Sequence, residues 1–166
     1  VIGVIMKIPV NLKHKPVFCI QDYENVDGRS ASAKGISLGL AQWNDRGKVD
    51  ISIKVWRHTG GKWSRQSEEM PLHRVIDMAL LICQTKEYLS NAYRYPKLYD
   101  ENNPIIERIG LQGDAMTFEV CKDNELIDED IKLFRDALNR DDELISERLH
   151  LLANKLYEAG YGRNIK

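Results

Sequence analysis

The chain of 166 residues lacks the features that define several classes of protein. It has no apolar run of about 18 residues, the length at which a helix can span a bilayer. Its apolar start, residues 1–8, has neither a basic leading region nor a small-residue cleavage site and is a poor match to a signal peptide. We therefore expect a globular protein with no membrane partner.

Cysteine is scarce, with Cys19, Cys83 and Cys121 far apart in the sequence. This spacing fits neither a disulfide framework nor a zinc motif. Each cysteine has apolar neighbours, which is typical of a buried thiol that packs as a small hydrophobic group. We therefore expect buried, reduced thiols and a cytoplasmic location.

Patterns that indicate catalysis are missing. No serine or cysteine stands in a nucleophile motif. His73 and Asp77 share a face of a predicted helix without a third metal ligand at usable spacing, so we interpret them as a structural hydrogen bond. The Gly60-Gly61-Lys62 run lacks the rest of a phosphate-loop pattern. We predict no catalytic residues, no metal ligands and no cofactor, and we do not expect an enzyme.

The net charge of −1 is unevenly spread along the chain. Residues 34–74 hold eight basic and four acidic side chains, a net of +4, whereas residues 123–166 hold seven basic and eleven acidic, a net of −4. This asymmetry indicates either a half that binds polyanions or a basic sheet that packs on acidic helices. Both interpretations stay open.

Alternating side chains predict an antiparallel sheet over residues 17–66. The clearest strand is 49–57, where β-branched residues occupy one face. Tight turns are expected at 44–47 and 59–61. The expected core residues are Leu38, Leu40, Ile51, Ile53, Val55, Val75, Ile76, Leu80, Phe134 and Leu149.

Helical periodicity follows the sheet. Residues 67–71 open a helix that is expected from about Pro71 to Leu89, with Ser67 as the N-cap candidate. A strand is plausible at 116–121, and Asp128 and Asp141 are expected to cap two final helices. The fold class is α+β, with a curved antiparallel sheet packed by a helix and a C-terminal helical hairpin. We expect residues 1–90 (sheet plus helix) and 91–166 (connector, extra strand and acidic hairpin) to pack as one domain.

All three tryptophans lie between residues 36 and 83. Trp56 falls on the strand parity opposite the aliphatic positions, beside Lys54. Aromatic rings interleaved with basic side chains on an open sheet face suit single-stranded nucleic acid, because bases stack on the rings and cations contact the phosphates. The candidate binding residues are Trp43, Arg46, Lys48, Lys54, Trp56, Arg57, Trp63 and Arg65.

The alternative is that the sheet face with Trp56 and Lys54 is buried under the C-terminal helices, just as the aliphatic face is buried in the core. The chain would then be a protein-interaction or small-ligand-binding domain without nucleic-acid activity. In that case residues 25–31 and 62–69 line a pocket or interface, and ion pairs fix Arg57, Arg65 and Glu68.

Two resemblances bear on this choice. The pieces NVDGRSA, SLGLAQWN, KVWR, KWSRQSEE and MPLHRV resemble a bacterial domain family of unknown function, over roughly residues 8–83. That family carries no established activity that can be transferred to this chain.

The second resemblance is weaker and covers about residues 37–81. Arg-Gly-Lys at 46–48, the strand VDISIKVW and a Lys-Trp strand are similar to the single-stranded-DNA-binding coactivator family called positive cofactor four, with its Whirly relatives. The resemblance implies a curved four-stranded sheet, a packing helix and a homodimeric DNA groove that uses Arg46, Lys48, Lys54 and Trp56. The sequence departs from that family at residues 67–72, where two acids replace expected bases.

Overall fold

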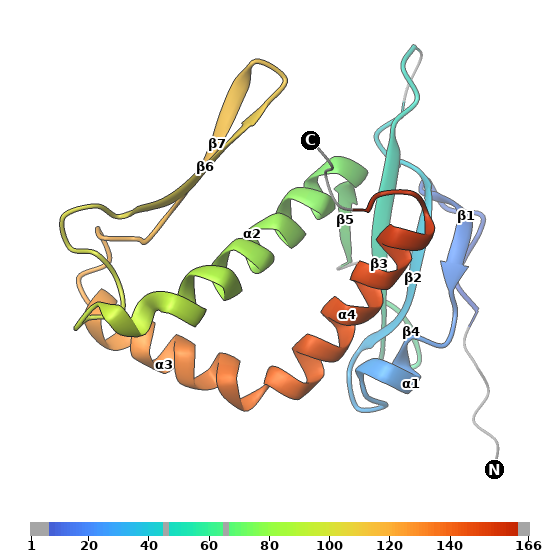
Figure 1. Ribbon diagram of the computed structural model, residues 1–166. Helices are drawn as coiled ribbons and strands as arrows, with labels where there is room; N and C mark the ends of the chain where they lie inside the picture. Colours follow the sequence, from blue (N-terminus) through green and yellow to red (C-terminus); the bar gives the residue numbers. More distant parts are fainter. Residues whose placement is uncertain (1–6, 45–46, 65–66, 163–166) are drawn as a thin grey trace. The chain divides into compact units, whose positions relative to one another are not determined.

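The computed structural model describes residues 7–44, 47–64 and 67–162, and it confirms the α+β class (Figure 1). The chain divides into two compact units, residues 1–82 and 83–166. The boundary falls inside helix α2 (Leu72–Asn91). None of the helices in the described ranges is long and apolar enough to cross a membrane.

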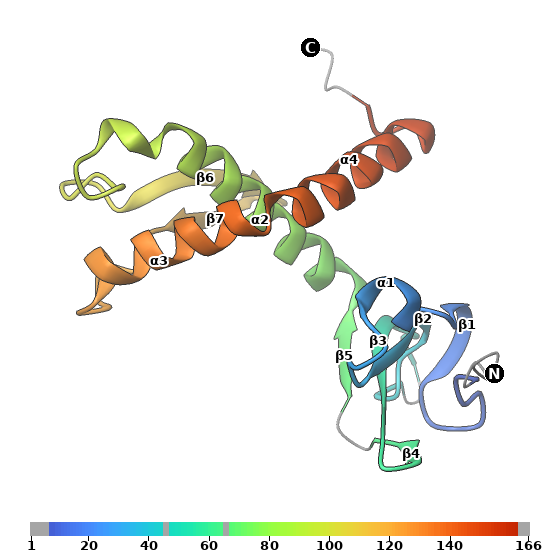
Figure 2. The same cartoon turned by 90° about the horizontal axis from the view of Figure 1, so that it is seen from below.

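The N-terminal unit is built on a five-stranded antiparallel sheet. Its elements are β1 (Lys15–Ile20), α1 (Glu24–Asp27), β2 (Ala33–Leu40), β3 (Ile51–Thr59), β4 (Lys62–Trp63) and β5 (Glu68–Pro71). The strand order is β1-β2-β3-β4, and β5 also pairs with β3 (Figure 2). The expected turn at 59–61 is present, with positive φ at Gly60 and Gly61, which suits the tight hairpin between β3 and β4.

One face of this sheet consists mainly of small residues. We call Gly35, Ser37, Gly39, Ser52 and Trp56 the small-residue face; all five are buried. The segment 8–14 contributes Ile8 and His14, both buried, to this side. A Cβ atom on Gly39 would lie 2.0 Å from the backbone oxygen of Lys15, so only glycine permits this close approach of β1 to β2.

The opposite face carries the large aliphatic side chains. We call it the aliphatic face, and its members stand directly opposite one another across the strands. They are Phe18, Ile20, Ile36, Leu38, Leu40, Ile51, Ile53, Val55 and Met70. Strand alternation was therefore predicted correctly.

The burial expected of several residues was wrong. Leu40, Ile51, Ile76, Leu80 and Phe134 are exposed, and Ile51 retains 49% of its accessible surface. The physical reason within the sheet is that Trp56 and His14 fill the space above the small residues. The tightly packed side of the sheet is thus the one with the smaller side chains.

The helix expected from about Pro71 to Leu89 is confirmed as α2, but the expectation that Ser67 caps it is wrong. Glu68 to Pro71 form strand β5, which pairs with β3, and the helix begins at Leu72. The two acids are held by distant partners, because Glu68 binds Arg57 and Glu69 binds His14. These long-range contacts outweigh the local preference of an acidic run for a helix N-terminus.

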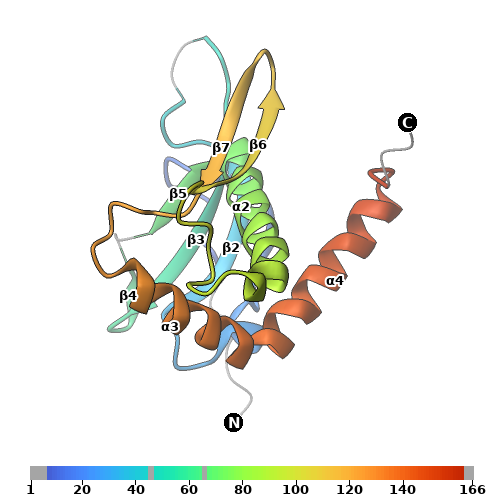
Figure 3. The same ribbon diagram turned by 60° about the vertical axis from the view of Figure 1, so that its left-hand side comes forward.

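The C-terminal unit combines a hairpin with helices. It contains the end of α2, a 3₁₀ turn (Ala92–Arg94), β6 (Ile105–Leu111), β7 (Asp114–Glu119), α3 (Ile127–Arg140) and α4 (Asp142–Glu158). The strand expected at 116–121 corresponds to β7, whereas β6 was not predicted. Helices α3 and α4 meet at Asp141 and diverge from it at an open angle (Figure 3).

The core of this unit is small and lies where the turn after α2 meets α3. Ala92, Leu98, Tyr99 and Ile131 are buried together. The Tyr99 hydroxyl donates to Asp128 Oδ1 at 2.6 Å, so Asp128, in the first turn of α3, anchors the helix to this core.

The expectation of buried thiols is wrong for all three cysteines. Cys19, Cys83 and Cys121 are free and exposed. Cys19 lies on the edge strand β1, whose residues are almost all exposed, so apolar sequence neighbours do not place it in a core.

Candidate functional site

The eight residues predicted to bind nucleic acid do not form one surface. Arg46 and Arg65 lie outside the described residues. Trp56, expected on an open face, is only 2% exposed, so that expectation is wrong. The reason is that His14, from the segment before β1, and Trp63 pack against its ring. A buried indole cannot stack on a base.

Lys54 and Trp63 both contact the buried Trp56 ring. The Lys54 ammonium lies 4.0 Å from the centroid of the ring. Trp63 is half-buried and meets Trp56 edge-on, with the ring centroids 6.0 Å apart, and it also contacts His58. These residues therefore form a packed aromatic cluster around the end of β3.

Trp43 and Lys48 lie in the connection between β2 and β3, at the other end of β3 from Trp63. Trp43 is 41% exposed, and its Nε1 donates to Asp50 Oδ2 at 2.9 Å. The Lys48 side chain is 89% exposed, with its Nζ 3.7 Å from Asp50 Oδ1. These two of the eight predicted residues are both exposed and close to one another.

Arg57 is held by a bidentate ion pair. Its Nη2 and Nε donate to the two carboxylate oxygens of Glu68 at 2.5 and 3.1 Å, and its Nη1 donates to Ser32 Oγ at 2.8 Å. The pairing lowers the pKa of Glu68 and raises that of Arg57. Three of its five N–H donors are engaged, and the Glu68 carboxylate neutralises its charge, which disfavours a role for Arg57 in binding a phosphate.

A chain of polar contacts joins the small-residue face to His14 and Glu69. Trp56 Nε1 donates to Ser37 Oγ at 2.8 Å, and Ser37 Oγ lies 2.8 Å from His14 Nε2. On the other side of the imidazole, Nδ1 lies 2.7 Å from Glu69 Oε1 and 2.9 Å from Ser52 Oγ. Sequence reasoning missed His14, Ser37, Ser52 and Glu69, because they lie far apart in the chain.

The network accommodates a neutral His14. The indole N–H can only donate, so Ser37 Oγ accepts from it and is able to turn its own proton toward His14 Nε2. The Nδ1–H of this tautomer then faces Ser52 Oγ and Glu69 Oε1. Burial lowers the pKa of His14, Glu69 opposes that effect, and the positive charge of Lys54 reinforces it. Burial likewise lowers the pKa of Lys54.

The serine, histidine and carboxylate resemble a hydrolase triad in their order of contacts. However, Ser37 and His14 are fully buried, and the serine hydroxyl is already engaged by Trp56. A nucleophile needs space for the reacting carbonyl and donors for the oxyanion. The cluster is therefore a structural network that fixes the N-terminal segment, β2, β3 and β5 to one another. Among the residues that the structure describes, no group of three His, Cys, Asp or Glu could hold a metal ion.

The candidate functional surface is the aliphatic face on the other side of the same strands. Phe18 is 71% exposed there, although it is a large apolar side chain. A groove of about 270 Å³ runs along Val17, Phe18, Leu38, Gly39, Leu40 and Ile51, and every side chain that lines it is apolar. The Arg57–Glu68 ion pair lies at one end of the face, since Glu68 stands opposite Val55. An apolar centre with a polar rim is the usual composition of a protein interface.

Comparisons with known proteins agree with the first resemblance. No curated protein and no solved structure matches this chain. A family model described as "Family of unknown function (DUF6530)" matches residues 6–161, well beyond the 8–83 expected, and thus spans both units. The chain belongs to this family of unknown function.

Proposed function

We propose that the N-terminal unit is a protein-interaction module whose aliphatic face binds the same face of a second copy of this chain. The observation that carries the proposal is the continuous apolar surface across β1, β2 and β3, on which Phe18 and Ile51 are exposed. Contiguous apolar patches of this kind mark interaction sites on soluble proteins. The buried network behind the face keeps the strands in place for binding.

The charge distribution favours self-association over binding to a charged partner. Arg57 and Glu68 already neutralise each other at the rim of the face. A twofold interface brings a surface against its own copy, so the paired Arg57 and Glu68 add little repulsion there, and Lys15, opposite Leu40 on the edge strand, stays at the solvated rim. In such a dimer, Phe18 of each copy enters the groove between Leu40 and Ile51 of the other.

We expect Phe18→Asp to abolish the dimer. The substitution places an unpaired carboxylate in the apolar groove, which raises the dissociation constant at least about a hundredfold, since a buried unpaired charge costs several kcal/mol. Sedimentation equilibrium of the full chain measures this directly. Because Phe18 is exposed in the single chain, the variant should stay folded.

Val10→Asp is the matched control. Val10 is also an exposed apolar residue, but it lies before β1 and outside the aliphatic face. The control should dimerise like the wild type. A wild-type chain that sediments as a monomer at high micromolar concentration would refute self-association.

A second candidate function is single-stranded nucleic-acid binding at the connection between β2 and β3. The exposed Trp43 ring and the Lys48 ammonium, which flank Asp50, favour it. If it is correct, oligothymidine quenches tryptophan fluorescence at about 50 mM salt, where phosphate contacts are strong. Trp43→Ala then weakens binding by about 1–3 kcal/mol, the contribution of one stacking platform. Absence of quenching and of binding would eliminate this candidate.

A further inference from the structure

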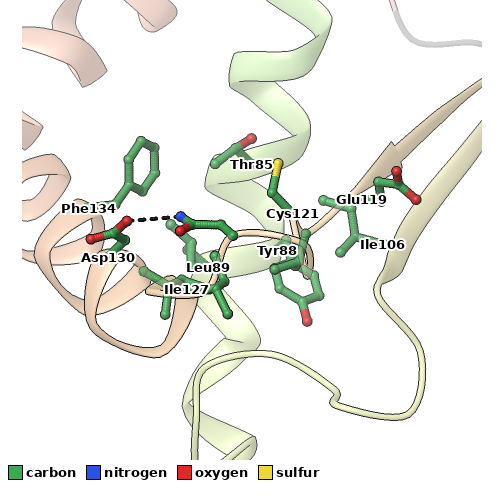
Figure 4. A pocket seen from close by; sticks show the side chains of 12 residues that line it. Thr85, Tyr88, Leu89, Ile106, Glu119, Cys121, Ile127, Asp130 and Phe134 are labelled. Atoms are coloured by element: carbon green, nitrogen blue, oxygen red, sulfur yellow. Dashed lines mark hydrogen bonds between the residues drawn. The ribbon is translucent and has the colours of Figure 1, made fainter.

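The C-terminal unit contains a pocket of about 340 Å³ between the end of α2, the β6–β7 hairpin and α3 (Figure 4). Its apolar lining comes from all of these elements. The residues are Leu89, Ile106, Val120, Ile127, Ile131 and Phe134. Ile131 belongs to the core of this unit, and Leu89, Val120 and Ile127 pack against that core. The core therefore holds these lining residues in place.

The size of the pocket selects the class of ligand. A volume of about 340 Å³ lies within the range of small-molecule sites, which is roughly 300–1,000 Å³. A folded partner helix does not fit in that space. The apolar walls select a ligand with an aliphatic or aromatic body.

The charge of the lining selects the polar group of the ligand. Two carboxylates, Asp130 and Glu119, line the pocket, and none of the described lining residues is a lysine or an arginine. Asp130 Oδ2 accepts a hydrogen bond from Asn124 Nδ2 at 2.9 Å, which orients the carboxylate. In Figure 4, Asp130 and Glu119 lie on different sides of the pocket, with Cys121 between them. The lining therefore attracts cations and repels anions.

Asp130 also has a simpler role, because an acidic residue in the first turn of a helix is stabilised by the helix dipole. That role accounts for the carboxylate, but it does not require an adjacent cavity or a second carboxylate across it. Phe134, which lines the pocket from α3 as Ile127 does, adds an aromatic ring with which a cation or an apolar group can interact.

We infer that this pocket binds a small amphipathic cation, namely an amine carried on an aliphatic or aromatic body. The body occupies the space between Leu89, Ile131 and Phe134, and the ammonium group donates to Asp130, whose carboxylate Asn124 orients. The site lies in a different unit from the aliphatic face and does not depend on the function proposed for that face.

Three probes of one shape test the charge preference. Phenylbutylamine, phenylbutanol and phenylbutyrate share an apolar body and differ in their terminal charge. In calorimetric titrations of the full chain, we expect the amine to bind about tenfold more tightly than the alcohol, because a hydrogen bond to a charged group is stronger than a neutral one. The carboxylate should bind least. Equal binding of the three probes, or no binding of the amine, would overturn the inference.

Asp130→Asn tests the residue most directly. Asparagine can still accept the bond from Asn124, but it removes the negative charge. The amine should lose about tenfold in affinity while the alcohol loses none. Asp136→Asn on the same helix is the control, since Asp136 pairs with Arg135 and does not line the pocket. Loss of amine binding in the control as well would overturn the assignment.

The reactivity of Cys121 provides a second measurement of binding that is independent of calorimetry. Its thiol lines the pocket, whereas Cys19 and Cys83 do not. The amine should slow alkylation of Cys121 by iodoacetamide and leave the other two rates unchanged, as followed by mass spectrometry of peptides. Alkylation of Cys121 at an unchanged rate in saturating amine would place the ligand elsewhere.

Discussion

Replacing Trp56 by alanine is expected to lower the free energy of unfolding by about 3–5 kcal/mol, the usual cost of truncating a large core aromatic. The ring is 2% exposed and lies 6.1 Å from the His14 ring and 6.0 Å from the Trp63 ring, measured between centroids. Its removal leaves a cavity above Gly35 and deprives Ser37 of its indole donor. Urea denaturation followed by circular dichroism measures the loss.

Two further variants separate packing from hydrogen bonding. Trp56→Phe keeps most of the apolar ring but loses the Nε1 donor, so it should cost less than alanine. Trp43→Ala removes an exposed tryptophan whose one hydrogen bond, to Asp50, is also exposed, and should cost no more than about 1 kcal/mol. If Trp43→Ala and Trp56→Ala prove equally mild, Trp56 is not a core residue.

The alternation of side chains was predictable from the sequence, but the choice of the buried face was not. Ile51, Ile53 and Val55 do share one face of β3, as their spacing predicts. Periodicity divides a strand into two sides without showing which side is covered. Here the cover comes from residues 8–14, where Ile8 approaches closely because Gly35 has no side chain.

The polar network explains why the candidate site was only partly predictable. Ser37 and Ser52 appear as ordinary polar positions of an exposed strand face, and His14 stands before the sheet in an irregular segment. Only the pairing of β2, β3 and β5 brings them to Glu69. Under the protein-interaction alternative, ion pairs were predicted to fix Arg57, Arg65 and Glu68. Arg57 and Glu68 do pair, because two adjacent strands place them side by side, and Arg65 lies outside the described residues.

Short elements with weak patterns were missed for a related reason. Strand β5 has four residues, two of them acidic, and its existence depends on a free edge of β3. Strand β6 exists through its partner β7. Pairing is a tertiary contact, and it overrides local propensity in strands more readily than in long helices.

The buried contact between His14 and Glu69 leads to the other large prediction. His14→Ala should destabilise the protein by about 2–5 kcal/mol near neutral pH, because it leaves a cavity at a fully buried site and removes the imidazole that bonds to Ser37 and Ser52. His73→Ala is the matched control, since His73 is exposed on α2, and it should change stability by no more than about 0.5 kcal/mol. Urea denaturation at constant ionic strength measures both variants.

The effect of His14→Ala should also depend on pH, with a sign that follows from the lowered pKa. His14 titrates near 6.5 when unfolded and below that value when folded, because burial and the Lys54 charge disfavour the imidazolium more than Glu69 favours it. As pH falls below about 6.5, the unfolded chain takes up the proton first, and the wild type loses stability. The alanine variant has no such loss, so the difference between the two should shrink from pH 7.5 to pH 5.5, roughly the range around an ordinary histidine pKa. A difference that widens instead would show that His14 is a buried imidazolium paired with Glu69, and the neutral network from Trp56 through Ser37 would be wrong.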